Sequence, residues 1–100
     1  AMCEICDQRT SSDFLDNGFS LFKIGKYTEG LVSLSQYENL RSQCLSIPSS
    51  CDLEEAVTAE TTRAAIYHKL GHRKLSVESY KASILKQKKL LRYTFNAKNV

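Results

Sequence analysis

The fold of this chain is decided by residues 14–37, which read FLDNGFSLFKIGKYTEGLVSLSQY. A second segment with the same spacing follows at residues 64–84 and reads AAIYHKLGHRKLSVESYKASI. In both segments a glycine, Gly25 or Gly71, follows a small residue by seven positions and a bulky residue by four. Two antiparallel helices pack closely when small residues face large ones, and the turn between them favours glycine. The sequence therefore predicts the same helical hairpin twice.

This pattern resembles the tetratricopeptide repeat, a helix-turn-helix unit of about 34 residues. The resemblance covers residues 12–37 and 58–85, with a spacer of about a dozen residues beyond one period between them. Phe14 occupies the opening tryptophan position of the first repeat and Glu60 that of the second, and neither repeat has the closing proline. The resemblance implies an all-α fold of antiparallel helical hairpins, about two repeats with a long C-terminal capping helix, that binds proteins.

Caps and helix breakers set the expected limits of the elements. Ser11, Ser12 or Asp13 can cap the first helix, and Pro48 ends the second. We expect helices at about residues 12–23, 27–45 and 73–95, and a third helix that Ser50 or Asp52 caps and that ends near Leu70 and Gly71. The corresponding organisation is a frayed segment at 1–10, one domain at 11–95 (repeat one 12–45, repeat two 53–85, helix extension 86–95) and a tail at 96–100.

Length and composition favour one small helical domain. The chain has 100 residues, of which 42% are hydrophobic, with one proline and four glycines. It lacks an apolar run near the ~18 residues of a membrane span, and Met2 follows a single residue that resembles a cloning remnant. We therefore expect a complete cytoplasmic protein; the alternative is a piece of a longer repeat array. Two hairpins bury little apolar surface, and a core of this size supplies about 3–5 kcal/mol, so we expect a hetero-oligomer.

Cysteines and histidines raise the question of a metal site. Cys3 and Cys6 have the spacing of zinc ligands, but Cys44 and Cys51 are separated by six residues that include a Pro-Ser-Ser turn. A Cys44–Cys51 disulfide is the second interpretation and reduced packing thiols are the third, which a cytoplasmic chain favours. His68 and the nearby His72 are separated by Gly71, and no third ligand accompanies them. The sequence predicts no metal and no cofactor, and because it contains no phosphate-binding glycine run or nucleophile elbow it predicts no enzyme.

Charge is divided unevenly along the chain. Residues 1–68 contain five Lys or Arg and ten Asp or Glu, whereas residues 69–100 contain nine Lys or Arg and the single acid Glu78. The net charge of +3 therefore conceals a basic last helix with Lys81, Lys86, Lys88, Lys89 and Arg92. This face is either solvated or a second partner face for an acidic protein. Nucleic acid binding would require aromatic side chains among the cations, and Tyr93 is the one good candidate.

The resemblance also assigns a partner-binding face. In tetratricopeptide repeats the first helix of each hairpin lines a concave groove, which here would contain Leu15, Phe19, Phe22, Lys23, Thr61, Ala65, His68 and Lys69. Family members that bind acidic chaperone tails use Lys and Asn in this groove, but this chain has Leu15, Phe19 and Thr62 at those positions. An apolar groove suits an amphipathic helix. The alternative is that the chain's own termini cover the phenylalanines.

Its length and apolar groove make the chain similar to the small tetratricopeptide-like chaperones of bacterial type III secretion. In that family the groove holds the C-terminal amphipathic helix of the needle subunit, and a second small helical protein acts as co-chaperone. The resemblance implies that the groove binds an aggregation-prone cargo helix and that the basic last helix contacts the co-chaperone or steers the cargo. The competing hypothesis is a generic adaptor or scaffold module that uses the same groove without a chaperone role.

Overall fold

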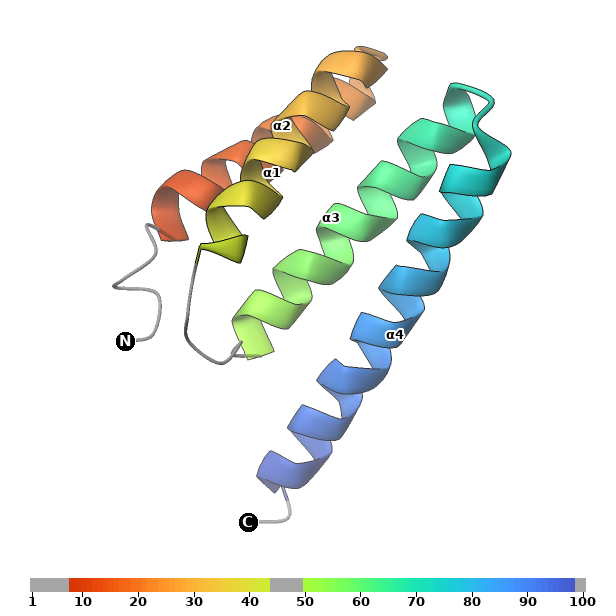
Figure 1. The fold of residues 1–100 in the computed structure, drawn as a ribbon. Helices are drawn as coiled ribbons and strands as arrows, with labels where there is room; N and C mark the ends of the chain where they lie inside the picture. The colour runs from red at the N-terminus through yellow and green to blue at the C-terminus, as the bar shows by residue number, and fades with distance from the viewer. Residues whose placement is uncertain (1–7, 44–49, 99–100) are drawn as a thin grey trace.

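Four helices make up the part of the chain that the computed structural model describes, residues 8–43 and 50–98, and this part contains no strand (Figure 1). They are α1 (Gln8–Lys23), α2 (Tyr27–Ser42), α3 (Ser50–Lys69) and α4 (Arg73–Lys98). Helices α1 and α2 form one antiparallel hairpin and α3 and α4 the other, and α3 packs against both helices of the first hairpin. The predicted all-α fold of helical hairpins is confirmed.

Both hairpin turns are built in the same way around a glycine. Gly25 has a φ of 84° and Gly71 a φ of 82°, in the left-handed region that a Cβ disfavours. In the second turn the amide of Gly71 donates to the carbonyl of His68, at 3.1 Å, and the amide of His72 donates to Tyr67, at 2.8 Å. Equivalent bonds close the first turn, and this pair of bonds is the Schellman pattern that satisfies the last carbonyls of a helix. The two glycines predicted from spacing therefore end α1 and α3.

Small residues let the helices of the first hairpin approach closely. A Cβ on Gly18 would lie 2.9 Å from Cδ2 of Leu34, and a Cβ on Gly30 would lie 3.3 Å from the carbonyl oxygen of Gly18. The Gly30 Cβ would also lie 3.1 Å from Cδ1 of Ile66, so α3 of the second hairpin packs into the same small-residue site. Leu34 and Ile66 are each 0% exposed. The contact between the hairpins is therefore built on Gly30.

Positions 46 residues apart play matching parts in the two hairpins. Ala64 and Ser76 correspond to Gly18 and Gly30; Ala64 is fully buried, and the Ser76 hydroxyl donates to its carbonyl at 2.8 Å. The hydrophobic core lies mainly between the first hairpin and α3, and it consists of Leu15, Leu34, Tyr37, Ala59 and Ile66 with Phe14, Phe22, Tyr27 and Leu31 packed against it. The second hairpin contributes to this core through α3.

Three helix limits differ from the expected ones. Helix α1 begins at Gln8, inside the segment predicted to be frayed, and Ser12, one of the expected caps, lies within the helix and donates to Oε2 of Glu55 on α3, at 2.7 Å. Helix α2 ends at Ser42, three residues before the expected limit. Helix α4 continues to Lys98, into the predicted tail, since no proline or glycine follows Gly71 in the sequence.

Candidate functional site

Three of the predicted groove residues form a cluster on α1, which we call the α1 patch: the exposed Phe19 and Lys23 and the half-buried Phe22. The two rings lie with their centroids 6.4 Å apart, and the Lys23 ammonium lies 4.7 Å from the centroid of the Phe19 ring. On its other side Phe22 contacts Tyr27, at 6.1 Å between centroids, and packs against the core. Phe19 itself is 40% exposed. The α1 patch therefore presents an aromatic ring that its neighbours hold in place but do not cover.

Leu15 was predicted to line the same groove, but it belongs to the core. Its side chain is 6% exposed and packs among the buried residues of the first hairpin. Its counterpart in the second hairpin is Thr61, whose hydroxyl lies 2.9 Å from that of Ser83 on α4. Thr61 remains exposed, whereas Leu15 is covered by the core cluster and does not line an exposed face.

Besides Thr61, the α3 residues of the predicted groove lie on the last two turns of that helix. Ala65 is half-buried, whereas His68 and Lys69 are exposed. His72 lies beyond the turn and makes an edge-on contact with Tyr67, at 6.1 Å between ring centroids. The two histidines are therefore placed as separate surface side chains on either side of the Gly71 turn.

One of the five predicted cations of α4 forms an ion pair within the chain. Lys86 points back to α3, where its ammonium lies 3.0 Å from Oε1 of Glu60. Lys81, Lys88, Lys89 and Arg92 are exposed. Four of the five predicted cations are thus available to a partner, and Lys86 is taken up within the hairpin.

Glu60 belongs to a network of ion pairs that connects α2, α3 and α4. It is 7% exposed, and besides Lys86 it accepts from Nη1 of Arg63, at 3.5 Å. Arg63 also pairs with Glu38 of α2. Glu60 occupies the position that Phe14 has in the first hairpin, and Lys86 occupies the position of Leu40. An ion pair in the second hairpin therefore replaces apolar residues of the first, which in the sequence was visible only as a departure from the repeat pattern.

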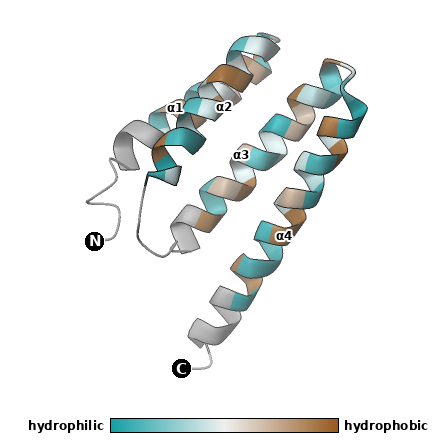
Figure 2. Ribbon diagram, viewed as in Figure 1, coloured by the Kyte–Doolittle hydropathy of each residue, from teal (hydrophilic) through white to brown (hydrophobic). Residues whose placement is uncertain are grey.

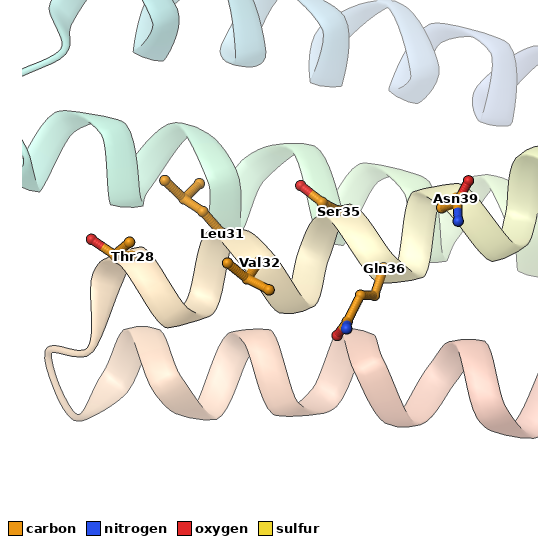
Figure 3. A pocket seen from close by; sticks show the side chains of 6 residues that line it. All are labelled: Thr28, Leu31, Val32, Ser35, Gln36 and Asn39. Atoms are coloured by element: carbon orange, nitrogen blue, oxygen red, sulfur yellow. The ribbon is translucent and has the colours of Figure 1, made fainter.

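A shallow depression lies on α2, and Figure 3 shows the side chains that line it. Its six lining side chains all come from this one helix, and they are Thr28, Leu31, Val32, Ser35, Gln36 and Asn39. It is open to solvent, and none of the predicted groove residues lines it. An open depression on one helix does not surround a small ligand as cofactor and substrate pockets do.

Within residues 8–43 and 50–98 no three His, Cys, Asp or Glu side chains are grouped as metal ligands. The predictions made for Cys3, Cys6 and Cys44 lie outside the described residues, as does the environment of the Cys51 side chain. None of the described helices has both the length and the apolar character that crossing a membrane requires.

Comparison of the chain with protein-family models, with curated proteins and with solved structures gave no match. The functional argument therefore depends on the geometry of the described residues.

Proposed function

We propose that this chain binds an amphipathic helix of another protein and that the α1 patch is the principal contact. The observation that carries the proposal is Phe19, an aromatic side chain that is 40% exposed while its ring contacts both Phe22 and the Lys23 ammonium. Aromatic side chains dominate the binding energy of protein interfaces, and one that is already positioned loses little rotamer entropy on binding. Ala65, His68 and Lys69 of α3 would extend the contact to the second hairpin.

The specific form of this proposal follows the resemblance to type III secretion chaperones. The bound helix would then be the amphipathic helix of a needle subunit, held so that it cannot self-associate, and a small helical co-chaperone would complete the complex. The generic adaptor hypothesis is favoured by a different observation, the fully buried Leu34 and Ile66 between the hairpins. These two side chains are buried by the chain's own helices, as in a self-contained module.

A binding assay with defined peptides tests the proposal. The C-terminal helices of needle proteins and a designed Leu/Glu amphipathic helix, each labelled with a fluorophore, would be titrated with the chain and with Phe19→Asp. A hot-spot loss of about 2 kcal/mol corresponds to roughly 30-fold weaker binding. Asp at position 19 would have Lys23 four residues later as an ion-pair partner, so the variant retains its helix.

Val32→Asp is the matched control. Val32 is 55% exposed on α2 and lies outside the α1 patch, so this variant should bind within about twofold of the wild type. Equal binding by the wild type and Phe19→Asp would show that the α1 patch is not part of the interface. Binding of the designed helix without binding of any needle-protein helix would support the adaptor and refute the secretion chaperone.

A further inference from the structure

Among the described residues, no helix covers the outer side of the second hairpin in the way that α3 covers the first hairpin. On α2, Leu34 is 0% exposed: it lies against Gly18 of α1 and belongs to the same buried cluster as Ile66 of α3, which packs against Gly30. The positions 46 residues later are Tyr80 and Ser76 on α4, and Tyr80 is 43% exposed. Helix α4 lies at the edge of the array, with α3 along one side (Figure 1). The positions of α4 that correspond to the α3-facing side of α2 are therefore exposed in the second hairpin.

Large apolar side chains form a row along this open side of α4. The outer row consists of Val77, Tyr80, Ile84 and Leu91, which are 45%, 43%, 50% and 69% exposed. Toward α3 the same helix uses small residues instead, and Ser76, Ser79 and Ser83 are all buried. Figure 2 shows hydrophobic segments recurring along α4. Spacings of three, four and seven residues place the outer row on one face of the helix, as in the contact seam of a coiled coil.

A row of lysines borders the outer row on the side away from α3. Lys74, Lys81 and Lys88 recur every seven residues, and all three are exposed. Each precedes a member of the outer row by three positions or follows one by four, which makes them neighbours on the helix surface. In a coiled coil, charged side chains in this flanking position choose the partner by pairing with opposite charge. The occupant that fits the lysine row has carboxylates beside its own apolar stripe.

A second copy of this chain does not meet that requirement. Two α4 helices packed through their outer rows in antiparallel order would bring the two lysine rows together, and like charges repel. In a head-to-tail stack of two copies, α1 of one copy would pack against α4 of the other. The α3 positions Ala59, Thr62 and Ile66 are buried, but their equivalents on α1 are the polar residues Asp13, Asp16 and Ser20. Those three side chains are exposed, which is the polar outer face of a terminal repeat.

We propose that the outer row and lysine row of α4 form a docking site for an amphipathic helix of another protein, one whose apolar stripe is flanked by Asp or Glu. The bound helix lies against α4 as α3 lies against α2, with its apolar side chains over Tyr80 and Ile84 and its carboxylates on Lys81 and Lys88. This site is on a different helix from the α1 patch, so it extends the proposed function without depending on it.

Two designed peptides test the site with the full chain. Both are amphipathic helices with the same Leu stripe, flanked by Glu in one and by Lys in the other, and binding is followed by fluorescence anisotropy. The Glu-flanked peptide should bind at least tenfold more tightly, and Lys81→Glu combined with Lys88→Glu should reverse the preference. Ile84→Asp should abolish binding, whereas Leu85→Asp, which changes an exposed residue outside the outer row, should not.

Each alternative occupant has its own readout. The inference is overturned if Ile84→Asp converts a dimer to a monomer in sedimentation analysis, which would make a second copy the occupant. It is also overturned if vesicles of anionic phospholipid bind the wild type and not Ile84→Asp, while the Glu-flanked peptide binds neither. Peptide binding that is lost in Phe19→Asp and retained in Ile84→Asp would refute the α4 site and leave the α1 patch supported.

Discussion

Replacing Gly18 by alanine tests the close approach of α1 and α2 on which the first hairpin depends. The added Cβ would lie 2.9 Å from Cδ2 and 3.0 Å from Cγ of Leu34, inside normal contact distance. Leu34 is 0% exposed and Ile66, also 0% exposed, packs nearby, so the leucine has no free volume to enter. The two helices must therefore separate or Leu34 must leave its rotamer.

The net effect of this substitution is the difference between two opposing contributions. Overpacking a filled core costs about 1–3 kcal/mol, and this site falls in the upper part of that range because Cγ as well as Cδ2 is in the way. Alanine in place of glycine within a helix contributes about 1 kcal/mol in the favourable direction. We expect the free energy of unfolding to fall by about 1–2 kcal/mol and the Tm to fall by about 4–8 °C for each kcal/mol.

Urea and thermal unfolding followed by circular dichroism at 222 nm measure this change, with an unaltered m-value as evidence that the fold is retained. Ser20→Ala is the control on the same helix: it is exposed and should change stability by less than about 0.5 kcal/mol. Combining Gly18→Ala with Leu34→Ala should cost at least about 0.5 kcal/mol less than the two single changes added together, because the new methyl occupies part of the vacated space. A Gly18→Ala protein that is more stable than wild type, with additive effects in this double-mutant cycle, would refute the packing argument.

Two further predictions concern the second hairpin. Gly71→Ala, at a φ of 82°, should lower the free energy of unfolding by about 1–2 kcal/mol in a urea titration, and an unchanged stability would contradict the strain argument. Lys86→Leu alone should destabilise by about 1–3 kcal/mol because it removes a partner of the nearly buried Glu60 carboxylate. The double change Glu60→Phe with Lys86→Leu restores the residue types found at positions 14 and 40 of the first hairpin, and should recover the wild-type stability or exceed it. Calorimetric melts of the three proteins would decide this, and a double variant less stable than Lys86→Leu would refute the equivalence of the two hairpins.

The candidate sites were predictable to different degrees. Phe19, Phe22 and Lys23 were predicted as a binding surface from their alignment with a repeat pattern, and the structure places them together, with Phe19 and Lys23 exposed and Phe22 half-buried. Leu15 follows the same pattern but is buried. The pattern assigns a residue to a position on its helix, but it does not show whether neighbouring helices cover that position. The helical spacing of the outer row of α4 can be read from the sequence, but the sequence does not indicate that none of the described helices covers this side.

The sequence by itself determined the local and periodic features: the two hairpins, their glycine-ended turns at Gly25 and Gly71, and the small residues at the helix crossings. These follow from backbone sterics and from helical periodicity within a few turns of chain. Only the tertiary structure decided that Leu34 is covered while Tyr80, its counterpart 46 residues later, is exposed. Periodicity shows which face of a helix is apolar, but burial depends on whether a segment distant in sequence lies against that face, and beyond α4 no described helix does.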